Sequence, residues 1–257
     1  MSITLALFNQ SGGVGKSTLT MNLGYQLAER QRRVLLVDMD PQASLTTFMG
    51  LDPDSLDITL YNALVDDETT QTVMDLPIQP DIYGMDLCPA NINLSAAELV
   101  LVSADMRDVR LKDALEPISD RYDVILIDCP PSLGLLSYIS LVAATHVLVP
   151  IQTQFKAFAG TNLLLNTLAR VKRRANRKLA VAGFAPTLFD ARRSQDERTL
   201  KAIQDRFTTV APVYDPIPWS TGFADAAEAR LPLALYDKRH KAIANLSAIV
   251  DHLEKLL

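Results

Sequence analysis

The stretch NQSGGVGKST, residues 9–18, lies between an apolar run and a helical pattern. Its glycines let backbone N–H groups close around phosphate oxygens, and a helix that begins near Lys16 adds a favourable dipole. The stretch therefore predicts a phosphate-binding loop, although Gln10 stands where the strict G-x-x-x-x-G-K-[ST] pattern has glycine. A glycine-rich turn that only opens a helix is the alternative.

Each polar side chain of this loop has its own predicted role. Lys16 would reach the β and γ phosphates of a nucleotide, Ser17 would bind Mg²⁺, and Thr18 would contact the α-phosphate. The residues predicted to contact the nucleotide are Ser11, Gly12, Gly13, Val14, Gly15, Lys16, Ser17 and Thr18.

Acidic side chains follow two further apolar runs, in the segments VLLVDMDPQ and VILIDCPPS. They are Asp38 and Asp40 in the first segment and Asp128 in the second. Because a carboxylate at a strand end can hold Mg²⁺ through water, Asp38 and Asp128 are predicted, with Ser17, to form the metal site. Either Asp38 or Asp40 could orient an attacking water. A lone acidic residue at such a place is otherwise a turn residue.

Short apolar runs alternate with helical patterns along the chain. This alternation predicts an α/β fold, a mostly parallel twisted sheet flanked by helices on both faces, with ligands at the carboxyl ends of the strands. The expected strands are 3–8, 34–37, 124–127, 146–150 and 179–185, and the expected helices are 17–30, 96–116, 135–143 and 160–174. Residues 52–80, rich in prolines and acids, are expected to form a surface insertion.

Length and composition indicate one soluble domain over residues 1–257. The net charge of −5 argues against a globally basic nucleic-acid binder. Two cysteines and three histidines show neither a disulfide framework nor metal-ligand spacing. The N-terminal segment lacks a signal-peptide pattern, and the apolar stretch 133–151 is expected to form a helix and a buried strand instead of a membrane span. We therefore expect a cytoplasmic protein.

Several blocks of the sequence resemble the ParA family of deviant Walker ATPases, the partition proteins related to MinD. Besides the segments above, they are LYNAL (60–64), DLCPANINLSAAE (86–98), TLFDARR (187–193) and IPWSTGFADA (217–226). The resemblance covers nearly the whole chain and implies a P-loop NTPase with a deviant Walker A loop, which binds and hydrolyses ATP with Mg²⁺. It also implies a homodimer that sandwiches ATP and binds nucleoid DNA non-specifically. A ParB-like or McdB-like adaptor protein would then trigger hydrolysis, so that a plasmid, chromosome or carboxysome is positioned.

Ser11 departs from the family pattern, because most members have a lysine there that reaches the phosphates of the other subunit. A serine cannot supply that charge. We expect slow or absent hydrolysis, a dimer that forms differently, or a cation from elsewhere. Lys156 is the predicted catalytic substitute, with an ordinary solvated lysine as the alternative. A serine at this position followed by that later lysine also resembles the carboxysome-positioning branch of the family.

The resemblance implies that adenine lies near the IPWS segment, residues 217–220. Pro218 and Trp219 are therefore predicted to contact the nucleotide, together with Gln42 from the VDMDPQAS block. The indole of Trp219 could instead belong to the core or to the dimer interface. Asp190 and Arg192 match a family pattern in the same region, with a surface ion pair as the alternative.

Cations gather in the segment RVKRRANRK, residues 170–178, where six of nine side chains are Lys or Arg. Such a cluster predicts sequence-blind, salt-sensitive DNA binding, or else a solvated helix end whose dipole favours positive charge. The predicted DNA-contacting residues are Arg170, Lys172, Arg173, Arg174, Arg177, Lys178, Arg192, Arg193, Lys238 and Arg239.

Three other functions compete with this interpretation. A MinD-like membrane-associated ATPase would need a basic amphipathic helix near the C-terminus, whereas SAIVDHLEKLL is not basic. An enzyme with a metal cluster would need suitably placed cysteines, and only Cys88 and Cys129 are present. A nucleotide-binding module with little hydrolysis would follow from the serine at position 11.

Overall fold

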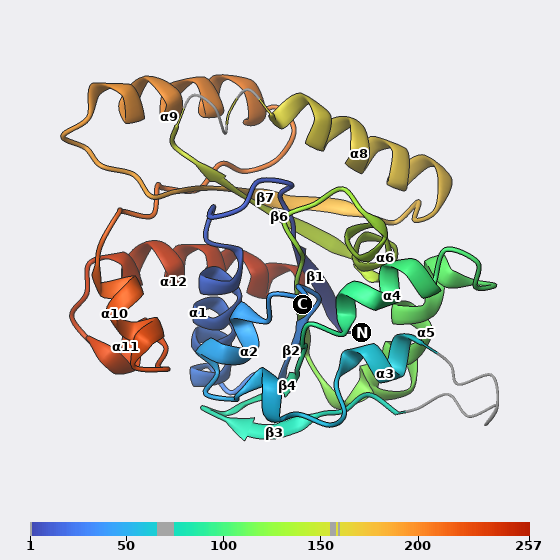
Figure 1. Ribbon diagram of the computed structural model, residues 1–257. Coiled ribbons are helices and arrows are strands. Elements are labelled where there is room, and N and C mark those ends of the chain that lie inside the picture. The colour runs from blue at the N-terminus through green and yellow to red at the C-terminus, as the bar shows by residue number, and fades with distance from the viewer. Residues whose placement is uncertain (1, 66–74, 155–157, 159) are drawn as a thin grey trace.

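Seven strands form one sheet in the order β3-β4-β2-β5-β1-β6-β7 (Figure 1). The computed structural model describes residues 2–65, 75–154, 158 and 160–257. The strands are β1 (Ile3–Leu7), β2 (Val34–Asp38), β3 (Gln79–Ile82), β4 (Met85–Cys88), β5 (Val124–Asp128), β6 (His146–Gln152) and β7 (Ala180–Thr187). All pairs run parallel except β3 with β4, which is antiparallel. The predicted mostly parallel sheet is confirmed.

Helices cover both faces of this sheet. They are α1 (Lys16–Glu29), α2 (Ser44–Phe48), α3 (Leu60–Leu64), α4 (Leu94–Val100), α5 (Arg110–Leu115), α6 (Leu135–Ala143), α8 (Thr161–Arg174), α9 (Ser194–Phe207), α10 (Gly222–Glu228), α11 (Leu233–Tyr236) and α12 (Ala242–Leu253). Short 3₁₀ turns occupy Pro53–Ser55, Arg107–Val109, Glu116–Arg121 and Glu254–Leu256.

Alternate residues of each central strand enter different cores. Leu5 and Leu7 of β1 pack with α1 and α12, while Ala6 and Phe8 pack with the helices of the other face, including α4, α5 and α6. Figure 1 shows α1 and α12 on one side of the strands and α4, α5 and α6 on the other. Because both faces are covered, the inner strands carry continuous apolar runs, which is why those strands could be read from the sequence.

The predicted helix 96–116 is wrong, because two helices occupy that segment. α4 ends at Val100 and α5 begins at Arg110, with a 3₁₀ turn between them. Met106 takes a left-handed φ of 53°, which interrupts helical hydrogen bonding there. The helical spacing of apolar residues continued across the break, but Leu99, Val102 and Met106 are exposed instead of packed.

The predicted surface insertion at residues 52–80 is also wrong in part. α3 lies within it, and Leu60 and Leu64 are fully buried against the core that α4 and α5 share. Thr59 and Asn62 form a capping box at the start of α3, so this helix has its own local start signal.

The apolar stretch 133–151 forms α6 and most of β6, as predicted. Among the described residues, no helix is both long and apolar enough to cross a membrane. The assignment of one domain to residues 1–257 stays a prediction.

Gly183 of β7 is expected to resist substitution more than Gly24 of α1. A Cβ on Gly183 would lie 2.4 Å from the ring of Tyr214 and 2.9 Å from the carbonyl oxygen of Pro212. Because the Tyr214 N–H donates to Phe184, this segment cannot move away freely. Gly183→Ala should lower the free energy of unfolding by about 1–3 kcal/mol in urea denaturation.

Gly24→Ala is the matched control. Its Cβ would meet the ends of the flexible Leu36 and Met85 side chains, and alanine favours a helix over glycine by about 1 kcal/mol. We expect Gly24→Ala to lower the free energy of unfolding by less than half as much as Gly183→Ala. Equal decreases in the two variants would contradict the packing explanation.

Candidate nucleotide site

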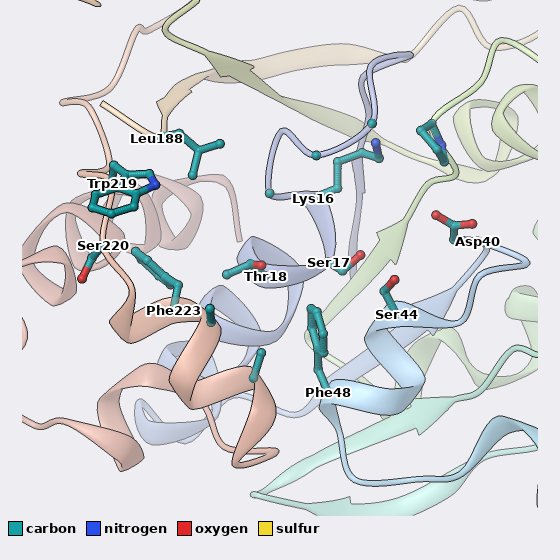
Figure 2. A pocket seen from close by; sticks show the side chains of 16 residues that line it. Lys16, Ser17, Thr18, Asp40, Ser44, Phe48, Leu188, Trp219, Ser220 and Phe223 are labelled. Atoms are coloured by element: carbon teal, nitrogen blue, oxygen red, sulfur yellow. The ribbon is translucent and has the colours of Figure 1, made fainter. Parts of the chain in front are cut away.

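Three strand ends meet beneath the loop of residues 9–15. Cα pairing places Asp128 of β5 beside Leu7 of β1 on one side and beside Asp38 of β2 on the other. The carboxyl ends of parallel strands share one edge of a sheet, so residues far apart in the sequence are brought together here. The loop between β1 and α1 lies above this edge (Figure 2).

The loop takes a backbone shape that its glycines permit. Gly13 and Gly15 have φ values of 71° and 87°, in the left-handed region that side chains disfavour. The loop then enters α1, whose first N–H groups and dipole favour an anion. The backbone conformation of the loop therefore fits the predicted phosphate-binding role.

Side chains from distant elements hold the loop in place. Asn9 Nδ2 donates to the carbonyl of Pro150 at 2.6 Å, and Gln10 Nε2 donates to the carbonyl of Gly160 at 2.7 Å. Thr187 Oγ1 donates to the carbonyl of Val14 at 3.0 Å. The loop is thus tied to β6, to the start of α8 and to β7.

Lys16 is folded back onto this loop. Its Nζ donates to the carbonyls of Asn9 and Ser11 at 3.1 and 3.0 Å, and the side chain is 6% exposed. Burial lowers the pKa of Lys16, while the carboxylates of Asp128 and Asp40 act in the opposite direction. A cation that leaves two carbonyl acceptors can redirect its hydrogen bonds to phosphate oxygens.

Asp128 is fully buried, and neither of its carboxylate oxygens has a hydrogen-bond partner of normal geometry among the described residues. Burial and the charge of Asp38 raise its pKa well above the usual range, although the nearby Ser17 hydroxyl opposes this. An unpartnered carboxylate beside a serine hydroxyl fits a magnesium ion and its water ligands. Ser17 and Asp128 are the residues that would hold the metal, and the metal role of Asp38 stays a prediction.

Asp38 and Asp40 occupy different environments. Both oxygens of Asp38 are engaged: Oδ2 accepts from the N–H and hydroxyl of Thr46 at 2.9 and 2.7 Å, and Oδ1 accepts from the N–H of Asp40 at 3.1 Å. Burial raises the pKa of Asp38 to about 6. Asp40 lies at the cavity wall instead, and its Oδ1 accepts from the N–H of Gln42 at 3.0 Å.

The cavity beside this loop measures about 440 Å³, within the range of small-ligand sites. Figure 2 shows Lys16, Ser17 and Thr18 between two walls. Asp40, Ser44 and Phe48 form one wall, and Leu188, Trp219 and Phe223 lie on the other. Ser220, from the segment 217–220 expected near adenine, also lines the cavity. The lining residues that the sequence did not suggest are Ser44, Phe48, Pro131, Leu188, Phe223, Ala224 and Ala227.

Of the other residues predicted to contact the nucleotide, some line the cavity and others do not. Trp219 lines it and is 48% exposed, so the alternative of a core position is excluded. Pro218 lines a neighbouring cavity instead. Gln42 is exposed away from the lining, and the side chain of Val14 is buried in the core, which leaves only its backbone to face a ligand. Lys156 lies outside the described residues.

The six cations of residues 170–178 are all exposed, and within the described chain no ion pair involves them. Arg192 differs, because it pairs with Asp190 through bonds of 2.9 and 3.0 Å, and the guanidinium lowers the pKa of that carboxyl to about 2. Arg193 approaches the same carboxylate at 3.4 Å. The ion pair that the sequence left as an alternative is therefore present.

The predicted DNA-contacting residues lie on three segments of the chain. Residues 170–178 precede β7, whereas Arg192 and Arg193 follow it, so the length of that strand separates them (Figure 1). Lys238 and Arg239 are exposed on a third segment, between α11 and α12.

Both cysteines lie inside the protein. Cys88 and Cys129 are fully buried, and burial raises the pKa of each thiol, to about 12 for Cys129. A buried thiol of raised pKa is neither a ready nucleophile nor a ligand for a shared metal cluster. In the described chain, no group of three His, Cys, Asp or Glu side chains is arranged to hold a metal alone.

Known proteins are similar to this chain in sequence and in fold. A sequence profile described as an AAA domain matches residues 2–181. The chain is 38% identical over 242 residues to the sporulation initiation inhibitor protein Soj of Bacillus subtilis, covering 94% of each. It is 36% identical to the chromosome partitioning protein ParA of Myxococcus xanthus, covering 98% of this chain and 87% of that one. The structure of cobyrinic acid a,c-diamide synthase from Mycobacterium smegmatis with bound ADP and magnesium matches with 34% identity and a TM-score of 0.86, covering 99% and 95%.

Asp128→Asn should stabilise the protein without ligand but remove the effect of magnesium. A carboxyl whose pKa is raised by folding costs stability as the pH rises above about 4, because only the unfolded chain releases its proton readily. At pH 8 without nucleotide, we expect the free energy of unfolding of the variant to be about 1–3 kcal/mol higher than that of the native chain.

Thermal and urea unfolding, each with and without Mg·ADP, would measure both effects. Asp57→Asn, at an exposed carboxyl, is the matched control and should change neither. A variant that is less stable without ligand, or that still gains stability from magnesium, would contradict this role for Asp128.

Proposed function

We propose that this chain works as an ATP-driven dimerisation switch. The premise is that it belongs to the ParA/MinD family of ATPases. The observation that carries the proposal is the preformed phosphate loop, with Lys16 beside the strand-end carboxylates Asp40 and Asp128. In this switch, ATP-bound subunits form a homodimer, and the dimer binds nucleoid DNA without sequence preference in the cytoplasm. A ParB-like or McdB-like adaptor protein resets it by triggering hydrolysis.

The side chains of the site divide the work of hydrolysis between them. Lys16 and the N–H groups of residues 12–18 neutralise phosphate charge, which is the main task in phosphoryl transfer. Ser17 and Asp128 would hold magnesium, which would supply further positive charge at the phosphates. Asp40 is the residue that orients the attacking water, because it faces the cavity. Asp38 helps to position Asp40 by accepting a hydrogen bond from its N–H.

Because Ser11 is uncharged, another residue must supply the positive charge that reaches the phosphates of the second subunit. The Ser11 carbonyl accepts a hydrogen bond from Lys16, but its side chain has no charge to offer a second subunit. Lys156 remains the predicted substitute. Without such a substitute, a nucleotide-binding module with little hydrolysis is the expected result. The carboxysome-positioning branch also stays a prediction, as does the choice among plasmid, chromosome and carboxysome cargo.

Two alternatives receive less support from the structure. A MinD-like protein would need a helix whose apolar face is free to bind a membrane, but the apolar face of α12 is buried against α1, with Leu246, Ile249 and Val250 in the core. An enzyme with a metal cluster held by cysteines is the other alternative. The burial of Cys88 and Cys129 speaks against it, because a buried thiol of raised pKa is a poor metal ligand.

Lys16→Ala should abolish ATP-dependent dimerisation, because the loop would lose the cation that neutralises the β and γ phosphates. Light scattering after size-exclusion chromatography, with ATP and with ADP, would measure the oligomeric state with and without duplex DNA. The native chain should form a dimer with ATP alone and bind DNA in that state. A Lys16→Ala protein that dimerises and binds DNA as the native one does would refute the switch.

Two further variants sharpen this experiment. Asp40→Ala should keep the ATP-bound dimer but hydrolyse at least a hundredfold more slowly, since binding needs no water-orienting group. Lys156→Ala should lower both dimerisation and hydrolysis if that lysine supplies the missing charge, and native behaviour in both assays would exclude it.

Arg173→Glu should weaken DNA binding at every sequence tested, whereas Arg192→Glu should have little effect. Arg173 is exposed and, in the described chain, forms no ion pair, so it is free to neutralise a phosphate. Arg192 is already neutralised by Asp190. Fluorescence anisotropy over a series of salt concentrations should show a shallower salt dependence for Arg173→Glu alone. Equal losses in both variants would contradict this choice of surface.

A further inference from the structure

Two short helices form facing sides of the nucleotide cavity. Ser44 and Phe48 of α2 line one side, and Phe223 and Ala227 of α10 line the other. Figure 2 shows Phe48 and Phe223 on either side of Thr18. A helix of five or seven residues has little stability of its own, so the positions of both helices depend on their contacts with the rest of the fold.

The C-terminus of α2 closes with a turn that usually ends a helix at glycine. Gly50 takes a φ of 92°, and its N–H donates to the carbonyl of Thr47 at 3.0 Å. The next N–H, that of Leu51, donates to the carbonyl of Thr46 at 3.2 Å. This pair of bonds places one residue in the left-handed region, where glycine avoids the clash of a Cβ.

Helix α10 ends with the same turn, but an arginine takes the place of the glycine. Arg230 has a φ of 58°, and its N–H donates to the carbonyl of Ala227 at 3.0 Å. The N–H of Leu231 donates to the carbonyl of Ala226 at 2.9 Å. A left-handed conformation destabilises a residue that has a Cβ, so a long side chain at this position indicates a role that glycine could not fill.

The side chain of Arg230 joins the two turns. Its Nη1 donates to the carbonyl of Gly50 at 3.2 Å, and its Cδ lies 4.0 Å from the position that a Cβ on Gly50 would occupy. A hydrogen bond from a charged donor is stronger than one between neutral groups. The ends of the two helices that form the cavity walls are therefore linked by one charged side chain.

Tyr83 holds the backbone of this arginine. Its hydroxyl donates to the carbonyl of Arg230 at 2.8 Å. Tyr83 lies in the turn between β3 and β4, and β4 pairs with β2 in the sheet. The Tyr83 ring packs against the same core as Phe48 and Phe223. Arg230 is thus fixed to the sheet through its carbonyl, so that its side chain can hold the end of α2.

We propose that Arg230 is a positioning residue that holds the two walls of the nucleotide cavity together and so slows the release of the bound nucleotide. Among the described residues, Arg230 is not part of the cavity lining, so it would act through the positions of Phe48 and Phe223. Without the bond to Gly50, α2 and α10 would be free to move apart, and the nucleotide would lose contacts with one of them. This inference rests on the proposed function and adds to it a control over nucleotide release.

Stopped-flow fluorescence would measure the rate of nucleotide release. The probe is ADP with an N-methylanthraniloyl label, bound with Mg²⁺ and displaced by excess unlabelled ADP. Trp219, the single tryptophan of the chain, lines the cavity and would transfer energy to the bound label. In Arg230→Ala, the dissociation rate constant should rise about three- to tenfold, the effect of one hydrogen bond.

Arg198→Ala is the matched control for the loss of one exposed positive charge. Arg198 is exposed on α9 and donates to Ser194 of the same helix. At physiological salt, where distant charges are screened, this variant should release the labelled ADP at the native rate. Equally fast release from Arg198→Ala and Arg230→Ala would assign the effect to charge and overturn the role of the Arg230–Gly50 bond.

Arg230→Gly separates this bond from the stability of the fold. Glycine lacks the side chain that reaches Gly50, but it adopts the left-handed φ without penalty. In the absence of nucleotide, Arg230→Gly should therefore unfold about 2–4 °C above Arg230→Ala. Both variants should nevertheless release the labelled ADP at the same raised rate. Slower release from the more stable variant would show that release follows stability, and would overturn the proposal.

Tyr83→Phe tests the support that the sheet gives to Arg230. Without the phenol hydroxyl, the carbonyl of Arg230 loses its partner, so release should be faster than in the native chain. In the Arg230→Ala background, Tyr83→Phe should add nothing, because it acts through the same side chain. Additive increases would overturn this part of the proposal.

The results also separate this inference from the proposed function. A native chain that does not bind the labelled ADP would contradict the proposed function itself. A native chain that binds it, with native release rates in both Arg230→Ala and Arg230→Gly, would overturn only the role of Arg230.

Discussion

The site depends on how the loop of residues 9–15 is held in place. Hydrogen bonds from Asn9, Gln10 and Thr187 join it to β6, to the start of α8 and to β7. A phosphate loop works because its N–H groups already point toward one place, so little ordering remains when the anion binds. These three bonds therefore set the shape that the glycines merely permit.

The burial of Asp128 lowers the stability of the fold but favours metal binding. Its unpartnered carboxylate would be an expensive feature in a protein selected for stability alone, since a buried charge without a partner is costly. The same isolation makes the group available to magnesium and keeps it close to Ser17 and Lys16. Groups of this kind are found where a protein gives up some stability to bind a ligand tightly.

Much of this site could be predicted because its signals are local. The glycines, Lys16 and Ser17 stand in one short stretch, and Asp38 and Asp128 each end an apolar run whose strand is buried on both faces. Strand-end carboxylates then meet by the rule for parallel sheets, without knowledge of strand order. The antiparallel β3 could not be predicted in the same way, because only four residues form it and two of them are exposed.

The remaining features depend on contacts between distant residues. The partners of Asn9 and Gln10 lie 141 and 150 positions away, and no pattern in the sequence connects them. The cavity wall formed by Leu188 and Phe223 comes from segments after β7, where neither apolar periodicity nor charge suggests a ligand. The break between α4 and α5 depends on the left-handed backbone of Met106. The sequence did not predict this break, because the exposed apolar residues near it continue the helical spacing.

The bond from Gln10 to Gly160 gives α8 a mechanical meaning. Gly160 precedes a helix of 14 residues, about 21 Å long, whose far end carries the exposed cations. A helix is stiff over that length, so a rotation at Gly160 would move its far end. A tilt of about ten degrees at Gly160 would sweep the far end through about 4 Å, roughly the width of one phosphate group. A shift at the phosphate loop would therefore be larger at the exposed cations of residues 170–178 than at the loop itself.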